Sequence, residues 1–289
     1  MPWLKIFLLA LCLIMGMEKS VSASPKLTDV TIVVSSCDKY GDLWDPFFKL
    51  LFRYWPSLKT YNKGIPIILI SNERDFTVDG VQTYKTGKDA GWSSNMLKVL
   101  KSVKTKYILY FQEDYLMSGP VNEKRLQYLI QKMKEQNIAT IEINKGSYYK
   151  GQIPYPKIKG VIRKGDKDDF RASLQSGLWD TKVFQGLLKE KESAWVFESE
   201  GTERSKILKD PFLIVSEEFP VVFVNACHLG FLEKSAVSFL KKEGISLKNI
   251  NLPVNSDYPF TLWFRHNIYP HAVFKRWVKI LKLLDPKIL

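Results

Sequence analysis

Short apolar runs alternate with segments of helical periodicity along the first half of the chain. The apolar runs lack polar alternation, which is typical of strands buried on both faces; they cover residues 29–36, 65–71, 81–84, 107–111 and 138–143. Apolar positions at helical spacing predict helices over residues 43–55 and 123–136, and a third from Gly91 onward with Ser93 or Ser94 as its N-cap. Strands that alternate with helices indicate βαβ units. We therefore expect an α/β, Rossmann-like fold: one mainly parallel sheet flanked by helices in a single domain.

The pattern changes after Asn144. Residues 145–167 are rich in Gly, Tyr, Pro and Lys and predict an ordered loop or lid. Residues 170–250 mix short helices, acidic loops and a strand at 221–224, and we expect them to complete the same sheet. The body, residues 25–271, is accordingly divided into a nucleotide-binding half, 28–143, and a second half, 144–271.

Both ends of the chain carry patterns of their own. An apolar run follows Lys5, and small residues stand at Val21-Ser22-Ala23, which predicts that residues 1–24 are a secretory signal peptide or an uncleaved signal anchor. Residues 272–289 have the pattern of a basic amphipathic helix, either a peripheral membrane contact or a helix docked on the core. We expect an exported or membrane-associated protein.

Charge and cysteine content narrow the classes of function. Lys and Arg outnumber Asp and Glu by 43 to 30, a formal net charge of +13, which favours an anionic ligand or surface. The basic residues are scattered, so we expect no nucleic-acid partner. Cys37 and Cys227 are far apart in the sequence and form no CxxC motif. They could pair in an oxidising compartment, but each stands beside a predicted core strand, where free cysteine is common, so we expect a fold that does not depend on disulfides. The sequence has no glycine-rich phosphate loop, Ser-His-Asp signature or HExxH motif, so kinases, hydrolases and zinc proteases have no support.

Polar residues follow three of the predicted strands at the points where the strands end. They are Ser35, Ser36 and Asp38 after the first strand, Asn72 and Glu73 after the second, and Gln112, Glu113 and Asp114 after the fourth. Open α/β sheets bind ligands beyond these carboxyl ends. Two carboxylates directly after an apolar strand suit a hard divalent cation such as Mg²⁺ or Mn²⁺, although they could also begin a solvated turn.

Two segments resemble GT-A-fold glycosyltransferases, in particular those of bacterial surface polysaccharide (LPS or capsule) synthesis. The segments are Ser35-Ser-Cys-Asp-Lys-Tyr-Gly-Asp-Leu-Trp-Asp-Pro-Phe-Phe48 and Tyr110-Phe-Gln-Glu-Asp-Tyr-Leu116, with Gly-Trp-Ser at Trp92 between them. The resemblance covers residues 28–117 and thins out afterwards. It implies a GT-A-like fold, a nucleoside-diphosphate sugar as donor and a saccharide or lipid-linked saccharide as acceptor.

The resemblance also implies roles for single residues. The donor would contact the first-strand loop and its neighbours, namely Ser35, Ser36, Asp38, Asn72, Trp92 and Glu113. A divalent metal, Mn²⁺ or Mg²⁺, would be held at the position of an Asp-x-Asp motif. Here Gln112 replaces the first acid, so the metal depends mainly on Asp114, and Glu113 would point away if the strand continued. His228 is a further candidate ligand, or a histidine with a local partner.

Glycosyl transfer with inversion, which the resemblance favours, needs a general base near the acceptor hydroxyl. Glu198 and Glu200 stand among aromatic residues in the segment 194–201, and Glu198 is the preferred candidate; the other interpretation is an acidic surface turn. Two other functions stay open. One is a non-catalytic exported protein that binds glycans or nucleotides with a degenerate GT-A fold, which Gln112 favours. The other is a basic peripheral protein that binds membranes or nucleic acid through charge.

Overall fold

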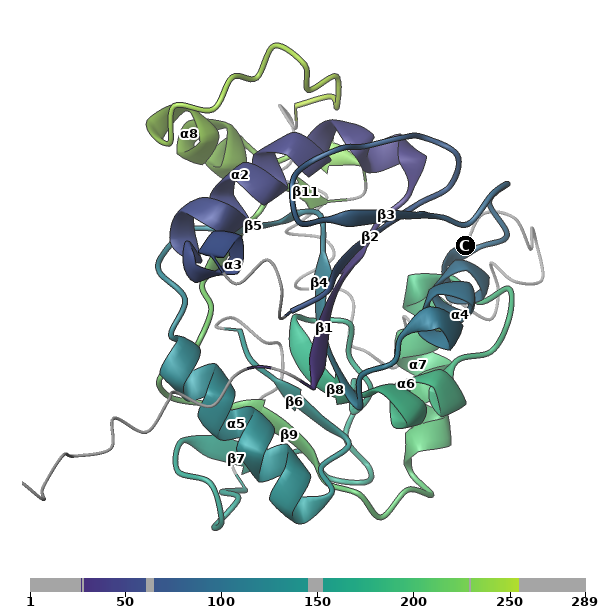
Figure 1. Cartoon of the computed structure of the whole chain (residues 1–289). Helices are drawn as coiled ribbons and strands as arrows, with labels where there is room; N and C mark the ends of the chain where they lie inside the picture. The colour runs from purple at the N-terminus through teal and green to yellow at the C-terminus, as the bar shows by residue number, and fades with distance from the viewer. Residues whose placement is uncertain (1–26, 28, 61–64, 145–152, 229, 255–289) are drawn as a thin grey trace, which may run out of the picture.

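The computed structural model describes residues 27, 29–60, 65–144, 153–228 and 230–254. The predicted segments at residues 1–24 and 272–289 lie outside this part of the chain. Eight strands form one sheet in the order β3-β2-β1-β4-β8-β6-β9-β7 (Figure 1). Their bounds are β1 Val30–Ser35, β2 Ile67–Ser71, β3 Gln82–Lys85, β4 Tyr107–Gln112, β6 Thr140–Glu142, β7 Val161–Arg163, β8 Gly177–Asp180 and β9 Phe212–Val215.

The sheet is mainly parallel. The four strands of the first half, β3, β2, β1 and β4, run parallel to one another. Strand β8 is antiparallel to both of its neighbours, β4 and β6, while β6 and β9 are parallel to each other and β7 closes the edge in the antiparallel direction. Strands from both halves of the sequence thus belong to one sheet, which confirms the expected α/β class and the single domain.

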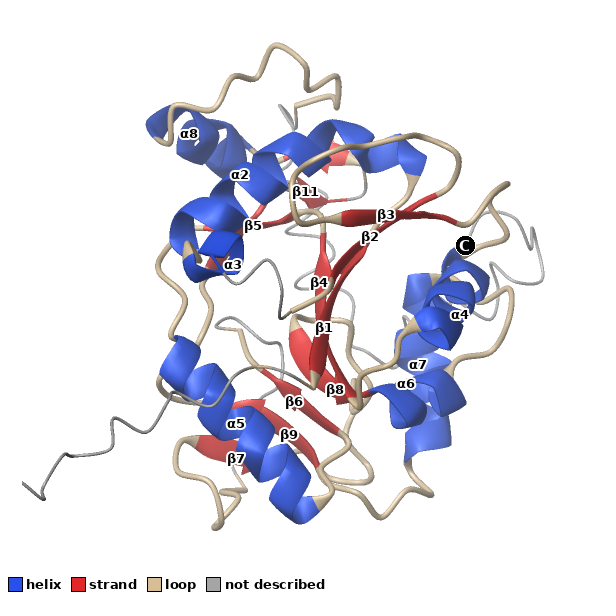
Figure 2. Ribbon diagram, in the orientation of Figure 1, coloured by secondary structure: helices blue, strands red, loops and turns tan. Residues whose placement is uncertain are grey.

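Helices cover both faces of the sheet because its strands are apolar on both sides (Figure 2). Ile32 and Val34 of β1 pack into one cluster with α2, α3, α5 and α8, and Val33 packs into the other with α4, α6 and α7. The helices are α2 Trp44–Tyr54, α3 Ser57–Thr60, α4 Trp92–Ser102, α5 Glu123–Gln136, α6 Thr181–Leu187, α7 Ala194–Ser205 and α8 Lys234–Lys242, with a 3₁₀ helix at Asp38–Leu43. The result is a three-layer arrangement with two apolar cores.

Two small antiparallel pairs lie outside the main sheet. Strand β5, Tyr115–Met117, pairs with β10, Phe223–Asn225, and β11, Cys227–His228, pairs with β12, Phe231–Leu232. The strand predicted at residues 221–224 corresponds to β10, at Phe223–Asn225, and belongs to a second sheet rather than to the main one. The segment predicted as a loop or lid at 145–167 contains β7, because Val161 and Ile162 supply a short apolar edge strand beside β9.

The N-cap of α4 is Gly91 rather than Ser93 or Ser94. Gly91 has φ +91°, a conformation that favours glycine, and both serines already lie inside the helix. Their hydroxyls instead accept hydrogen bonds from the backbone N–H groups of Glu192 and Lys191, 2.8 Å each. The serines therefore join α4 to the linker between α6 and α7.

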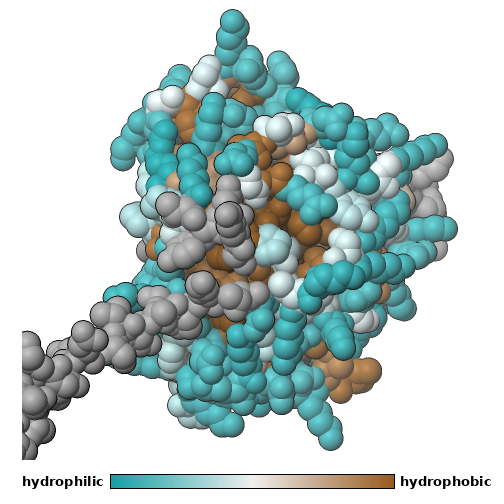
Figure 3. Space-filling model, viewed as in Figure 1, coloured by the Kyte–Doolittle hydropathy of each residue, from teal (hydrophilic) through white to brown (hydrophobic). Residues whose placement is uncertain are grey.

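One face of the molecule is shown by the hydropathy of its residues in Figure 3. Polar side chains cover most of the rim in Figure 3, and apolar side chains are visible toward the centre of that face. Among the described residues, no helix has the length and apolar character needed to cross a bilayer.

Candidate active site

The carboxyl ends of the parallel strands meet at one edge of the sheet, and most predicted site residues lie there. Ser35 ends β1 and is the register partner of Gln112, which ends β4. Asn72 follows the end of β2, and Glu142 ends β6. The antiparallel β8 begins at this same edge, since its first residue, Gly177, pairs with both Tyr110 and Glu142. Ligands of open α/β sheets bind at this edge, so its side chains form the candidate site.

Asp38 joins the loop after β1 to the loop after β2. Its carboxylate accepts three backbone hydrogen bonds, from Asn72 at 2.8 Å, Glu73 at 2.9 Å and Arg74 at 3.0 Å. In return, the backbone N–H of Asp38 donates to Oδ1 of Asn72 at 3.1 Å. Partial burial opposes ionisation, but the three N–H donors outweigh it and lower the pKa of Asp38. Asp38 and Asn72 therefore join the loops that follow β1 and β2.

Two tryptophans fix the serines that end β1. The indole N–H of Trp92 donates to Oγ of Ser35 at 3.0 Å, and that of Trp44 donates to Oγ of Ser36 at 2.7 Å. Trp92 also packs against Phe197 of α7, with ring centroids 5.3 Å apart. The predicted contacts Ser35 and Trp92 are thus joined at the start of α4, and Ser36 is joined to the start of α2.

The acidic pair lies in the turn between β4 and β5. Strand β4 ends at Gln112, so Glu113 does not continue the strand and is not forced to the opposite side from Asp114. The Glu113 side chain is 7% exposed, and Oδ1 of Asp114 is buried with no hydrogen-bond partner among the described residues. Burial raises the pKa of Asp114 to about 7; burial and then repulsion by Asp114 raise the pKa of Glu113 well above its ordinary value. The two carboxyls form a unit that a cation would stabilise.

Gln112, which occupies the first position of the expected acidic motif, faces a different environment. Its amide donates to the Tyr110 hydroxyl at 3.2 Å. Tyr110 is fully buried, and burial raises the pKa of its hydroxyl far above the ordinary value. Gln112 therefore belongs to a buried polar contact beside β8, and the acidic unit consists of Glu113 and Asp114.

Two thiols and a phenol surround this acidic pair. Burial and then the charge of Glu113 raise the pKa of Cys37, and burial and then the charge of Asp114 raise the pKa of Cys227 to about 11. Burial, followed by electrostatic interactions with Cys227 and Glu113, raises the pKa of Tyr40 to about 12. Both cysteines are free and half-buried. These groups are neutral at physiological pH, so they lie within electrostatic range of the carboxylates without neutralising them.

Glu198 lies on the second half of the same edge. It is half-buried on α7, and its Oε1 accepts a hydrogen bond from the backbone N–H of Leu174 at 2.8 Å. Burial is the largest cause that raises its pKa to about 7, against the opposing effect of this hydrogen bond. A carboxyl of this kind exchanges protons readily near neutral pH, which is the property a general base requires.

The other candidates are placed differently. Glu200 is exposed on α7, so the structure singles out Glu198 from the two predicted acids. His228 is half-buried on β11. The backbone N–H of Ala226 donates to the carbonyl of Asp114 at 2.7 Å, which brings the segment before His228 beside the acidic pair. The role of His228 as a metal ligand stays a prediction.

The fit of a divalent metal to these residues depends on the acidic pair. Within the described ranges, no three His, Cys, Asp or Glu side chains gather into a site that would hold a metal unaided. The unpartnered oxygen of Asp114 beside Glu113 nevertheless fits a Mg²⁺-type ion, which is commonly held by one or two carboxylates together with substrate phosphates.

The sequence pattern did not predict one buried pair of charged residues near Glu198. Glu142 at the end of β6 and Lys164 after β7 form a buried ion pair, with Nζ and Oε2 2.6 Å apart. The sequence offers only a weak signal for it, an acid inside an apolar strand, since nothing links Glu142 to a lysine 22 residues later.

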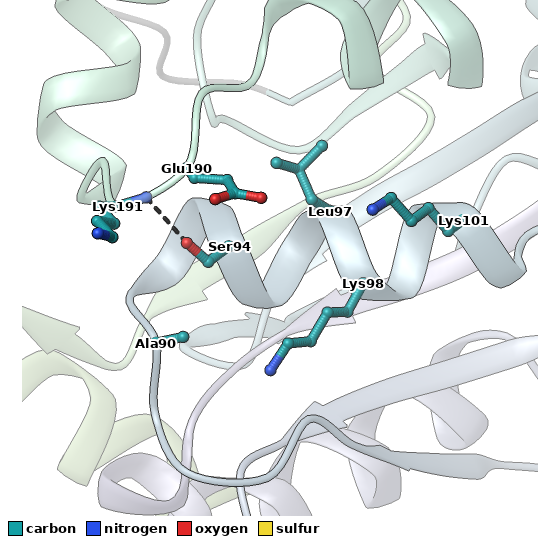
Figure 4. A pocket seen from close by; sticks show the side chains of 7 residues that line it. All are labelled: Ala90, Ser94, Leu97, Lys98, Lys101, Glu190 and Lys191. Atoms are coloured by element: carbon teal, nitrogen blue, oxygen red, sulfur yellow. Dashed lines mark hydrogen bonds between the residues drawn. The ribbon is translucent and has the colours of Figure 1, made fainter.

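A separate hollow lies on the outer side of α4. It has a volume of about 290 Å³ and is lined by Ala90, Ser94, Leu97, Lys98, Lys101, Glu190 and Lys191 (Figure 4). Lys98 is already engaged, because its ammonium donates to the carbonyl of Thr86 at 2.8 Å. None of the predicted site residues lines this hollow, so we assign the site to the sheet edge.

Comparisons with known proteins give a general likeness only. No protein-family model and no curated protein matches the chain. Among solved structures, S. aureus TarS 1–349 is similar with a TM-score of 0.48 and 8% identity, over 68% of this chain and 60% of that one. The same protein in complex with UDP-GlcNAc gives a TM-score of 0.45 and 9% identity, over 67% and 58%. The chain thus spans about 60% of these structures, and a likeness at this level carries no functional argument.

Proposed function

We propose that this protein is a glycosyltransferase that moves a sugar from a nucleoside-diphosphate sugar to a saccharide or lipid-linked acceptor. One observation carries the proposal: the ligand edge of the sheet holds two separate acidic centres with different surroundings. Glu113 and Asp114 are adjacent, and Oδ1 of Asp114 is buried without a hydrogen-bond partner in the part of the chain that the structure describes, whereas Glu198 stands apart with a pKa of about 7. A cation-binding pair and a lone base are the two groups that transfer from a diphosphate donor needs.

On the donor side, Glu113 and Asp114 are the residues that would hold a divalent ion. Such an ion supplies positive charge that stabilises the departing diphosphate. The loops that Asp38 and Asn72 join, together with Ser35, Ser36 and Trp92, would form the wall against the nucleoside. The positive balance of the chain, +13, favours an anionic donor of this kind.

On the acceptor side, Glu198 is the proposed base. Its ionised carboxylate takes the proton of the acceptor hydroxyl while that oxygen forms a bond to the anomeric carbon of the sugar. The bond from the anomeric carbon to the diphosphate breaks, and the nucleoside diphosphate leaves with the electron pair. Attack from the face opposite the leaving group gives inversion. The hydrogen bond from Leu174 orients the carboxylate for this role.

The test measures donor binding and donor turnover on the same preparations. Thermal shifts are recorded with a panel of nucleoside diphosphates and their sugars, with and without Mn²⁺. A ligand at 100 times its dissociation constant should add about 2.7 kcal/mol to the free energy of unfolding. Asp114→Asn should abolish the Mn²⁺-dependent part of the shift, and Glu135→Gln, an exposed acid on α5 paired with Lys132, should leave it unchanged.

Turnover separates the enzyme from a binding protein. Glu198→Gln should bind the donor like the wild type but release nucleoside diphosphate at least 100-fold more slowly, the usual contribution of a general base. No stabilisation by any nucleotide would refute the proposal. Donor binding without turnover under every acceptor tested would instead favour the non-catalytic binding protein.

A further inference from the structure

Glu142 and Lys164 form an ion pair in the interior of the protein. The side chains are 5% and 2% exposed, and Nζ of Lys164 lies 2.6 Å from Oε2 of Glu142. The other oxygen of Glu142, Oε1, is also buried and has no hydrogen-bond partner among the described residues. A buried ion pair is often no more stable than two well-packed apolar side chains, because both charges lose their hydration. Stability alone therefore does not account for this pair.

One loop connects the ion pair to Glu198. Lys164 Nζ donates to the carbonyl of Phe170 at 3.0 Å, and four residues later the N–H of Leu174 donates to Glu198 Oε1 at 2.8 Å. Phe170 has φ +55°, an unfavourable conformation for a side chain of this size, so the loop needs contacts to hold it. Between the two points, the N–H of Ala172 donates to Thr202 Oγ1 of α7 at 3.1 Å, on the same helix as Glu198.

The polar groups around Glu198 come from several elements. Glu142 of β6 and Lys164 after β7 carry the charges, and Ser173 and the Leu174 N–H come from the loop. Tyr110 of β4 and Tyr115 of β5 lie within electrostatic range and are neutral at physiological pH. After burial and the Leu174 hydrogen bond, the charge of Glu142 raises the pKa of Glu198 and that of Lys164 lowers it.

We propose that the Glu142–Lys164 pair is a positioning device for Glu198: it holds the 170–174 loop in place and sets the ionisation of Glu198 through two opposite charges. The pair acts through Glu198 and touches neither substrate. The consequence for catalysis rests on the proposed function, in which Glu198 is the base, whereas the electrostatic coupling itself is a property of this chain alone.

The test is a titration of Glu198 by NMR in the full chain labelled with ¹³C at the glutamate carboxyls, with Glu198→Gln used to assign the signal. In Glu142→Gln, the repulsion between the charges of Glu142 and Glu198 is removed while Lys164 stays in place, so the midpoint of Glu198 should fall by roughly one pH unit. In Lys164→Met, the charge of Glu142 acts on Glu198 without an opposing cation, so the Glu198 signal should titrate in two steps, as expected of interacting carboxyls. The double variant Glu142→Gln/Lys164→Met carries neither charge and should titrate in one step near the wild-type midpoint.

These outcomes differ from those of a purely structural role. Loss of packing alone lowers the melting temperature of every variant and leaves the midpoint in place. Arg125→Met is the matched control, because Arg125 is a buried cation that contacts the opposite end of β7 through Lys159. It should destabilise without moving the titration of Glu198.

Glu142→Gln and Lys164→Met each test the proposal independently, so the test remains possible if one of the two variants does not fold. An unchanged or higher midpoint in Glu142→Gln, or a single unshifted step in Lys164→Met, overturns it. The titration needs no donor or acceptor. If the expected shifts are absent while the protein still turns over a donor, only the role proposed for the Glu142–Lys164 pair is refuted. Shifts of the expected kind in a protein that never turns over a donor refute only the proposed function.

Discussion

At the residue scale, the carboxylate of Asp38 is engaged by three backbone N–H groups of the segment after β2. A carboxylate with this many donors has little capacity left for a ligand. Asp38 as a donor contact stays a prediction, and the structure shows a further contribution of its carboxylate, which joins the loops that follow β1 and β2. The same distinction applies to Asn72, whose Oδ1 accepts from the Asp38 backbone.

We therefore expect Asp38→Asn to lower the free energy of unfolding by roughly 1–3 kcal/mol at pH 7, because the amide turns an N–H donor toward backbone donors. The folded state lowers the pKa of Asp38, so its stabilising effect is present above the unfolded pKa and is lost as pH falls through the folded pKa. The difference between wild type and variant should thus shrink below about pH 4. Denaturant unfolding at several pH values measures it, with Asp45→Asn, an exposed acid paired with Lys49, as control. A pH-independent difference would contradict the assignment.

At the scale of elements, the start of α4 is joined to the linker that leads into α7. Ser93 is buried and exchanges two hydrogen bonds with Glu192: its N–H donates to the Glu192 carbonyl at 3.1 Å and its hydroxyl accepts from the Glu192 N–H at 2.8 Å. Ser94 makes a similar contact with Lys191, but at an exposed position. The linker precedes Glu198 by only a few residues, so this junction places the proposed base relative to Trp92 and β1.

The two serines form a matched pair for experiment. Ser93→Ala leaves the Glu192 N–H without its partner in a buried position and should cost about 1–2 kcal/mol. Ser94→Ala exposes its partner to water and should change stability by less than about 0.5 kcal/mol. Chemical denaturation of both variants provides the measurement. Equal effects from the two substitutions would show that the junction does not depend on burial.

The helices and strands were largely predictable from the sequence, whereas the order of the strands in the sheet was not. Helix α5 has the predicted bounds, and β1, β2 and β4 differ from prediction by one or two residues, because long apolar runs and helical periodicity are local signals. The insertion of β8 between β4 and β6, and the edge strand β7, depend on pairing between distant segments. Ser35, Asn72 and Asp114 could be named from the sequence because they end or follow apolar strands, and Glu198 because it stands among aromatic residues. The contact of Glu142 with Lys164 joins distant segments and could not be predicted.

At the scale of the whole molecule, a strongly basic chain places four buried or half-buried acids close to one edge of the sheet. Glu113 and Asp114 follow β4, Glu142 ends β6 and Glu198 faces the loop before β8. Burial raises the pKa values of Glu113, Asp114 and Glu198, so the folded state binds protons that the unfolded chain releases. Ionisation of these carboxyls at neutral pH is therefore expected to lower the free energy of unfolding.

Glu198→Gln tests this relation between site and stability. The unfolded pKa of a glutamate is about 4.3 and the folded pKa of Glu198 is about 7, so the stability contributed by this group is fully present below pH 4 and is lost as pH rises to about 7. The amide carries no charge and still accepts the Leu174 hydrogen bond. The variant should therefore match the wild type near pH 4 and exceed it by about 1–3 kcal/mol at pH 8, a gain of several degrees in melting temperature. Glu200→Gln, at an exposed position on the same helix, should show no such trend. Calorimetry from pH 4 to pH 8 measures the difference. A Glu198→Gln variant no more stable than the wild type at pH 8 would show that the carboxylate of Glu198 is well solvated and that its pKa is not raised as a general base requires.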